Sequence, residues 1–202
     1  MIIKICGLRR EEDVSAAVSA GADICGFILS PRFKRYMDPK ALGNIKVPAG
    51  VLKAGVFVDE SIPYVISAVG DGGVDLIQLH GEEDEDYIRE LKEALPGKRV
   101  IKVFKVKGPE DIGMGNGSSA DLILLDSGVG GTGRVFDHSL LSEIERDYIL
   151  AGGLNEDNVS GAVSNGGPHL MGVDVSSGVE TEGVKDPGKM KRFVINARKR
   201  SS

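Results

Sequence analysis

The chain has 202 residues, of which 41% are hydrophobic and 27% are charged, and this composition predicts one globular domain over residues 1–202. Its formal net charge of −5 argues against general attraction to nucleic acid or to an anionic membrane surface. No apolar run approaches the roughly 20 residues of a membrane-spanning helix, and the two cysteines and three distant histidines support neither a disulfide framework nor a metal site.

Residues 1–4 already have the pattern of a strand rather than that of a secretory signal. Free cysteines are typical of a reducing compartment. We therefore expect a cytoplasmic protein.

Short β-rich runs alternate with helix-like runs along the whole chain. Strands are expected at residues 2–6, 23–29, 52–58, 76–80, 100–106, 122–126, 148–151 and 171–175. Their ends fall about 20 to 29 residues apart, which is the length of a βα unit. Helical patterns lie between them, at residues 11–20, 63–69, 83–95, 139–145, 156–165 and 187–199.

Eight strands in strict alternation with helices favour a single (β/α)8 TIM barrel over an open doubly wound sheet. One unit departs from the pattern. Residues 108–120 contain four glycines and little apolar periodicity, so we expect a degenerate helix 5 region there, with a loop or a single turn.

Strand alternation sorts the side chains by face, because successive residues of a strand point to opposite sides of the sheet. If the more apolar face meets the helices, four reactive side chains point into the barrel near the C-terminal ends of their strands: Cys6, His80, Asp126 and Asp174. Active sites of this fold lie at that end.

Each of these side chains also has an ordinary structural explanation. Cys6 could be a small buried hydrophobe, as Cys25 is expected to be, although Cys6 ends its strand and precedes a glycine. Asp126 could cap the following loop, and Asp174 could bind the backbone of the next turn. In the functional interpretation, Cys6 is a base or nucleophile and Asp126 is a general acid.

Glycine-rich turns follow three of the late strands, at residues 127–133, 152–155 and 176–178. Glycine lets backbone N–H groups approach an anion closely, and a following helix N-terminus adds favourable partial charge. The turns therefore predict a cradle for the phosphate of a small molecule. Residues 128–133 also fit G-x-G-x-x-G, but Arg134 follows instead of an apolar helix, which argues against a dinucleotide.

A basic loop, residues 30–36, follows the second strand at the same end of the barrel. A solvated loop is the default interpretation of such a sequence. Beside an anion site, however, Arg35 or Arg32 could clamp a carboxylate.

Several motifs together carry a resemblance to one family. They are KICG at 4–7, GF at 26–27 with SP at 30–31 and KRY at 34–36, GVFV at 55–58, QLHGE at 78–82, LD at 125–126 with GGTG at 130–133 and FD at 136–137, AGGLN at 151–155, and VDVSSGVE at 173–180. In this order and spacing, over nearly the whole chain, they closely resemble the phosphoribosylanthranilate isomerase family of tryptophan biosynthesis.

The resemblance implies a (β/α)8 barrel enzyme that rearranges N-(5-phosphoribosyl)anthranilate to 1-(2-carboxyphenylamino)-1-deoxyribulose 5-phosphate, an Amadori reaction. It implies Cys6 as general base, Asp126 as general acid and Arg35 as the partner of the anthranilate carboxylate. His80 and Asp174 match positions that line the site. The phosphate is expected on backbone N–H groups of Gly130, Gly131, Gly133, Gly152, Gly153, Ser176, Ser177 and Gly178.

Neither a metal nor an organic cofactor is expected, because both protons can travel through side chains. The expected partner is a phosphorylated small molecule, with no nucleic acid and no membrane, and the sequence leaves monomer and homodimer open. Two alternatives remain. A related phosphosugar isomerase of histidine biosynthesis usually has two aspartates where this chain has Cys6 and Asp126, and a non-catalytic phosphate-binding barrel leaves that pair unexplained.

Overall fold

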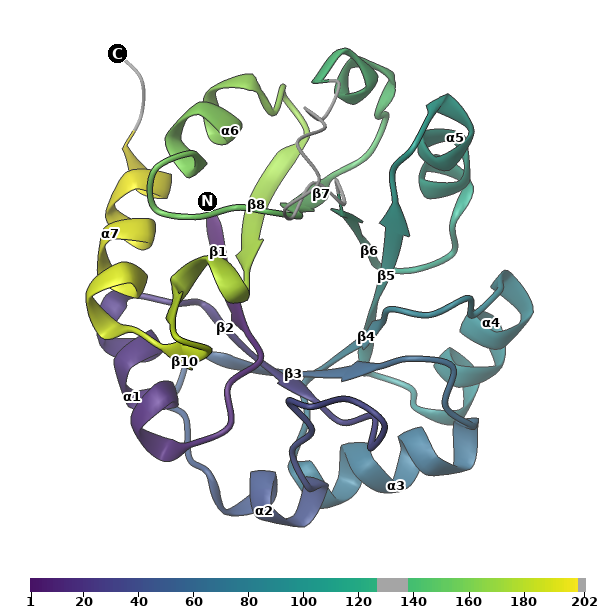
Figure 1. The fold of residues 1–202 in the computed structure, drawn as a ribbon. Helices are drawn as coiled ribbons and strands as arrows, with labels where there is room; N and C mark the ends of the chain where they lie inside the picture. Colours follow the sequence, from purple (N-terminus) through teal and green to yellow (C-terminus); the bar gives the residue numbers. More distant parts are fainter. Residues whose placement is uncertain (127–137, 200–202) are drawn as a thin grey trace.

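Eight parallel strands close into a barrel in the computed structural model, which describes residues 1–126 and 138–199 (Figure 1). The strands are β1 Ile2–Cys6, β2 Ile24–Ile28, β3 Leu52–Phe57, β4 Leu76–Leu79, β5 Arg99–Lys105, β6 Leu122–Asp126, β7 Tyr148–Ala151 and β8 Leu170–Val175. Each pairs with its neighbours in chain order, and β8 pairs with β1 in the register Ile3↔Val173. The predicted fold is confirmed, and every predicted strand end lies within one residue of the observed one.

Helices surround the barrel (Figure 1). They are α1 Glu11–Ala20, α2 Pro39–Asn44, α3 Ile62–Gly72, α4 Glu85–Ala94, α5 Pro109–Gly117, α6 Val159–Asn165 and α7 Pro187–Arg198, with 3-10 helices η1 His138–Glu143 and η2 Ser177–Val179. A short antiparallel hairpin, β9 Glu180–Thr181 and β10 Val184–Lys185, separates β8 from α7. No helix in the described part of the chain combines the length and apolar character needed to cross a bilayer.

Aspartates define the starts of three helices. Asp38 accepts hydrogen bonds from the backbone N–H groups at the start of α2, Asp84 does so for α4, and Asp186 does so for α7. These bonds satisfy donors that have no partner within the helix. The helix α2 was not expected from the sequence, because its six residues are too few to show a helical period.

The expectation of a loop or a single turn at residues 108–120 is wrong, because α5 forms a nine-residue helix there. Asp111 accepts hydrogen bonds from Lys107 N and Gly108 N, which fixes the first turn. Gly115 lies close to the sheet, where an added Cβ would be 3.3 Å from Ile123 Cδ1. Gly115 therefore lowers helix propensity but also lets the helix approach the barrel closely. The unit that lacks an α-helix among the described residues is the next one, where η1 lies between β6 and β7.

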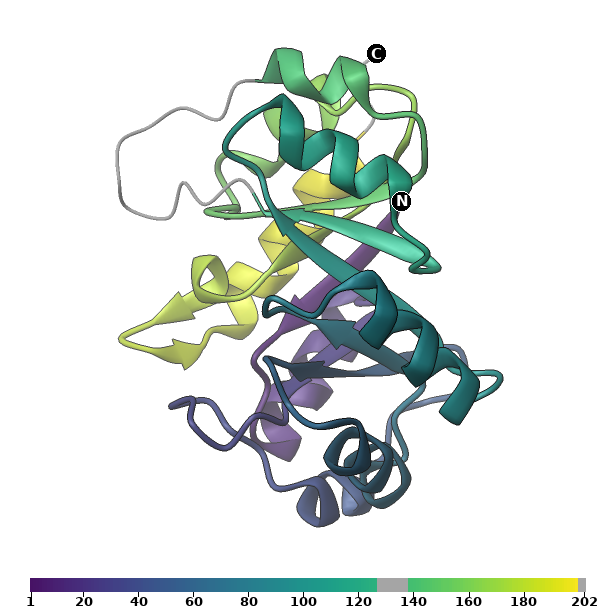
Figure 2. The ribbon, with the colours of Figure 1, turned by 90° about the vertical axis from the view of Figure 1, so that its right-hand side faces the viewer.

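Alternate residues of the strands build two separate cores. The outer core lies between strands and helices and contains large side chains such as Phe27, Ile77, Tyr148 and Phe193. The inner core fills the barrel with Ile24, Ala54, Leu76, Ile101, Val103, Leu124, Ile149 and Ala151. Because the interior is packed in this way, functional side chains are confined to the C-terminal end of the strands. Figure 2 shows the loop after β2 and the β9–β10 hairpin projecting from that same end.

Candidate active site

A pocket of about 330 Å³ lies at the C-terminal mouth of the barrel. Its lining includes all four side chains that strand alternation predicts to converge there: Cys6, His80, Asp126 and Asp174. The apolar residues Ile28 and Val56 line the same pocket. The pocket therefore offers an apolar surface on which a ligand can pack, together with titratable groups.

Cys6 is the last residue of β1, carries a free thiol and is only 7% exposed as a residue. The neighbouring strand makes room for it with Gly26, where a Cβ would lie 2.9 Å from Cys6 Sγ and 3.0 Å from Lys4 Nζ. Cys25 points the other way, into the outer core, and burial raises its pKa to about 11. The two cysteines therefore lie in different environments, and only Cys6 faces the pocket.

An ion pair lies beside the Cys6 thiol. Lys4 has no exposed surface, and its Nζ lies 3.1 and 3.0 Å from the two carboxylate oxygens of Asp174. Burial alone would lower the pKa of Lys4, but the charge of Asp174 and the Cys6 side chain outweigh it and raise this pKa. Lys4 therefore stays an ammonium ion next to the thiol. The sequence offered one signal for it, since Lys4 precedes Cys6 by two residues and shares its face of β1.

Asp126 lies at the end of β6, and its Oδ2 is 3.7 Å from His80 Nε2. The other ring nitrogen of His80 lies 3.4 Å from Gln78 Nε2. Both Asp126 and His80 retain some exposure to the pocket. Gln78 is almost fully buried, and its Oε1 has no hydrogen-bond partner among the described residues.

Two glycine-containing turns form one rim of the pocket. Gly152 and Gly153 follow β7 with φ values of +93° and +63°, and Ser176, Ser177 and Gly178 follow β8. The turns touch, because a Cβ on Gly178 would lie 1.9 Å from the carbonyl oxygen of Leu154. The other predicted phosphate contacts, Gly130, Gly131 and Gly133, lie outside the described residues.

Arg35 does not line the pocket itself but lies beside it, on the loop after β2. Its Nη2 is 2.7 Å from Glu180 Oε2, and its side chain is 36% exposed. Glu180 ends the VDVSSGVE motif, but no sequence pattern indicated its contact with Arg35, because 145 residues separate the two.

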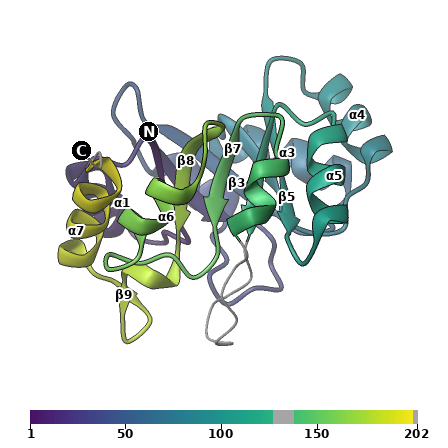
Figure 3. The same ribbon diagram turned by 90° about the horizontal axis from the view of Figure 1, so that it is seen from above.

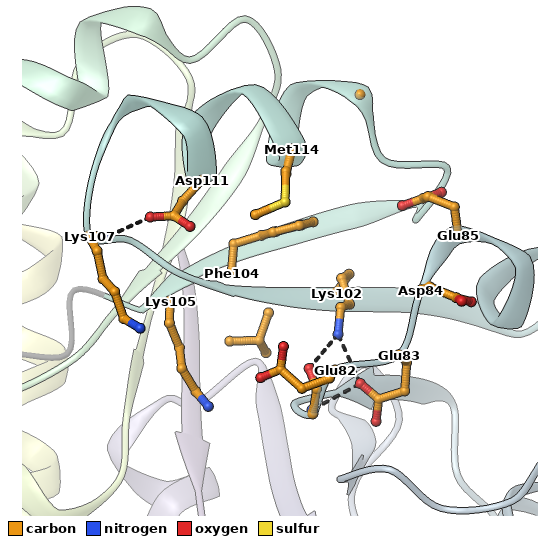
Figure 4. A pocket seen from close by; sticks show the side chains of 13 residues that line it. Glu82, Glu83, Asp84, Glu85, Lys102, Phe104, Lys105, Lys107, Asp111 and Met114 are labelled. Atoms are coloured by element: carbon orange, nitrogen blue, oxygen red, sulfur yellow. Dashed lines mark hydrogen bonds and ion pairs between the residues drawn. The ribbon is translucent and has the colours of Figure 1, made fainter.

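A larger pocket, of about 550 Å³, lies between α4 and α5 on the outer side of β5 (Figure 4). Its buried charges bind each other: Lys102 Nζ donates to Glu83 Oε2 at 2.8 Å and to the Gly81 carbonyl at 2.7 Å. Figure 4 shows this pair below Phe104, toward which Met114 points from α5. The outer pocket therefore contains a structural ion pair, whereas the mouth pocket collects a thiol, two carboxylates and an imidazole.

Comparisons with known proteins agree over almost the whole chain. The family model described as N-(5'phosphoribosyl)anthranilate (PRA) isomerase matches residues 3–196. The N-(5'-phosphoribosyl)anthranilate isomerase of Geobacter sp. (strain M21) is 41% identical to the chain, with 98% of each protein covered.

Solved structures give the same result. A phosphoribosyl anthranilate isomerase in complex with reduced 1-(o-carboxyphenylamino)-1-deoxyribulose 5-phosphate superposes with a TM-score of 0.83 and 34% identity, covering 98% of this chain and 99% of that one. Monomers of the dimeric phosphoribosylanthranilate isomerase from Thermotoga maritima superpose with a TM-score of 0.83 and 35% identity, over the same shares of the two chains.

Proposed function

The chain belongs to the N-(5'-phosphoribosyl)anthranilate isomerase family, and we propose that Cys6 and Asp126 carry the proton transfers of its reaction. The protein is an isomerase of L-tryptophan biosynthesis that converts N-(5-phosphoribosyl)anthranilate to 1-(2-carboxyphenylamino)-1-deoxyribulose 5-phosphate. Neither a histidine-pathway isomerase nor a non-catalytic phosphate-binding barrel is favoured by any of these matches. The observation that supports the proposed catalytic pair is their presence on the wall of one pocket, on strands separated by β7 and β8.

The first step opens the sugar ring. Asp126, protonated, donates its proton to the furanose ring oxygen, the bond from C1′ to that oxygen breaks, and the nitrogen lone pair forms a C=N bond. General acid catalysis suits this step because the leaving oxygen would otherwise depart as an alkoxide. His80 Nε2 lies 3.7 Å from Asp126 Oδ2, so the imidazole is next to the carboxylate that this step leaves.

The second step removes a proton from C2′. Cys6 acts as a thiolate, and the electrons of the C2′–H bond form an enolamine while the iminium nitrogen becomes neutral. Tautomerisation of the enolamine then gives the aminoketone product. The ammonium group of Lys4 lies beside this thiol, on the same face of β1.

Binding contacts complete the proposal. The phosphate binds to backbone N–H groups at Gly152, Gly153 and residues 176–178, which line the pocket. We propose that Gly130, Gly131 and Gly133, which lie outside the described residues, contribute further N–H groups. Arg35 binds the anthranilate carboxylate, for which a guanidinium provides a planar set of donors. His80 and Asp174 line the sugar-binding part of the pocket.

We further propose that residues 1–202 act as one domain in the cytoplasm. Its partner is the phosphorylated small molecule. The Thermotoga maritima relative is a dimeric protein whose monomers have also been solved, so both a monomer and a homodimer are considered for this chain. Gel filtration with light scattering distinguishes these two states.

Substitution of the catalytic pair tests the proposal. We expect Cys6→Ser and Asp126→Asn each to lower kcat by about 10² to 10⁴, because each removes one general acid or base. The loss of anthranilate fluorescence from fresh substrate measures turnover, and calorimetric titration with the reduced product analogue measures binding.

Cys25→Ala is the matched control, since it removes the thiol that faces the outer core and should leave kcat nearly unchanged. If folded Cys6→Ser or Asp126→Asn protein turns over at a near-normal rate, that residue is not part of the catalytic pair.

A further inference from the structure

We propose that Glu180, on the hairpin after β8, is a positioning residue that holds Arg35 at the mouth of the pocket for the substrate carboxylate. The inference rests on the proposed role of Arg35 and adds the residue that sets its position. Nothing in the motif pattern links the two residues, which come from opposite ends of the chain.

Glu180 is a buried carboxylate with a cation on each oxygen. Its Oε2 accepts from Arg35 Nη2 at 2.7 Å, and its Oε1 accepts from Lys185 Nζ at 2.8 Å. The side chains of Glu180 and Lys185 are only 7% and 3% exposed. Burial would raise the pKa of Glu180, but Lys185 and Arg35 outweigh it and lower this pKa, so the carboxylate is ionised at neutral pH.

The hairpin that carries Glu180 is fixed at several points. Lys185 pairs with Glu180 across the two strands, and Lys185 Nζ also donates to the Ser176 carbonyl at 2.8 Å. Lys189, on α7, donates from Nζ to the Glu180 carbonyl at 2.8 Å. The Glu180 carboxylate is therefore held by contacts to the turn after β8 and to α7 rather than by a free loop.

The contact brings Arg35 next to the catalytic strand. A Cβ on Gly7 would lie 3.1 Å from Arg35 Cδ and 3.0 Å from Ser176 Oγ, and Ser176 Oγ donates to the Cys6 carbonyl at 3.1 Å. The Arg35 side chain thus passes over the turn that directly follows Cys6. From this position the guanidinium is beside the pocket in which the thiol lies.

A guanidinium has five N–H donors, and the contact with Glu180 is made through Nη2. The remaining donors are oriented by that contact, so less conformational freedom is lost when a carboxylate binds to them. The opposite role is also physically possible, in which Glu180 competes with the substrate for Arg35. The two roles predict opposite changes in KM when the carboxylate is removed.

The experiment compares Glu180→Gln with Glu182→Gln, a control at an exposed position in the turn of the same hairpin. We expect Glu180→Gln to raise KM about tenfold with kcat changed less than about threefold, because the chemistry at Cys6 and Asp126 is left in place. Glu182→Gln should leave both constants unchanged.

Two inhibitors provide the decisive readout: the reduced product analogue and the same molecule without its carboxyl group. Glu180→Gln should weaken binding of the carboxylated analogue by about tenfold and leave the other unchanged. A general loosening of the pocket would weaken binding of both inhibitors equally, and this result would overturn the proposal. A KM of Glu180→Gln that is lower than that of wild type, or equal to it, would also overturn the proposal.

Arg35→Ala separates this inference from the proposed function on which it rests. If Arg35→Ala still discriminates between the two inhibitors, the role of Arg35 itself is wrong. If Arg35→Ala loses the discrimination while Glu180→Gln keeps it, only the positioning role fails. Should Glu180→Gln not fold, Glu180→Asp gives the same test, because it keeps the charge but withdraws the carboxylate from Arg35. If Glu180→Asp discriminates between the two inhibitors as wild type does, the proposal is overturned.

Discussion

Lys4 and Lys53 are both buried lysines, but their pKa values shift in opposite directions. Lys4 faces a carboxylate inside the barrel, whereas Lys53 Nζ donates to the carbonyl groups of Leu42 and Gly72 near the ends of α2 and α3. Asp174 and Cys6 raise the pKa of Lys4 against the effect of burial, whereas burial lowers the pKa of Lys53. The difference lies in the contact: Lys4 Nζ is hydrogen-bonded to a carboxylate, whereas Lys53 Nζ is hydrogen-bonded to carbonyl groups, and the charge of Asp75 raises the pKa of Lys53 less than burial lowers it.

Replacement of Lys4 by methionine should strongly destabilise the protein. Lys4→Met leaves Asp174 as an unpaired buried carboxylate, and such a loss costs about 3–5 kcal/mol. Because the folded pKa of Lys4 is raised above 10.5, the contribution of the pair is complete below pH 10.5 and is lost as the pH rises through the folded pKa. Urea unfolding at a series of pH values should therefore show a constant gap to wild type near neutrality that narrows above pH 10.5.

Lys53→Met is the matched control. The folded pKa of Lys53 lies below 10.5, so the folded protein releases this proton before the unfolded chain does. Wild-type stability relative to Lys53→Met should therefore increase with pH on the alkaline side, the reverse of the trend for Lys4→Met. If the difference in unfolding free energy between wild type and Lys4→Met does not decrease above pH 10.5, the raised pKa of Lys4 is contradicted.

The strands of the barrel could be predicted from the sequence, but several connecting elements could not. Apolar runs that end in glycine or a polar residue located all eight strands to within one residue, and alternation then placed Cys6, His80, Asp126 and Asp174 at one mouth. The helix α5 was missed because local propensity is overridden by its close packing on the sheet.

The β9–β10 hairpin was missed for a different reason. Its strands have two residues each, which is too short to show any period. The pairing of Arg35 with Glu180 depends on this hairpin and on the closure of the barrel, and no local pattern encodes such a contact. The strands that line the mouth pocket were therefore predictable, whereas the hairpin that contacts Arg35 was not.

The contact between the turns at the rim of the pocket makes a sharp prediction about Gly178. In Gly178→Ala the added Cβ would overlap the Leu154 carbonyl, so the two turns must separate. We expect a clear loss of stability, of about 1–3 kcal/mol, and a raised KM for the phosphorylated substrate. Thermal unfolding and steady-state kinetics measure the two effects.

Gly161→Ala is the control for this substitution. Gly161 lies in α6 with nothing within 4 Å of an added Cβ, so alanine should stabilise the helix by about 0.5–1 kcal/mol and leave KM unchanged. Equal behaviour of the two variants would mean that the rim turns do not touch in solution.

Closure of the barrel joins the first and last parts of the chain. β1 pairs with β8, and α7 packs beside α1 (Figure 3). Cys6 and Lys4 come from β1, whereas Asp174 comes from β8 and Glu180 from the hairpin that follows it. The proposed site therefore exists only while this seam between the two ends of the chain is closed.

A substitution in α7 that does not touch the lining of the pocket should consequently affect the site only by lowering the stability of the whole barrel. Phe193 is fully buried in the outer core, and Phe193→Ala should cost about 3–5 kcal/mol, whereas Ile195→Ala, at a position that is 47% exposed, should cost little. Because the seam carries both the thiol and its ion pair, activity and far-ultraviolet circular dichroism of Phe193→Ala should be lost at the same urea concentration. Loss of activity at clearly lower urea would mean instead that the β1–β8 seam opens before the rest of the barrel.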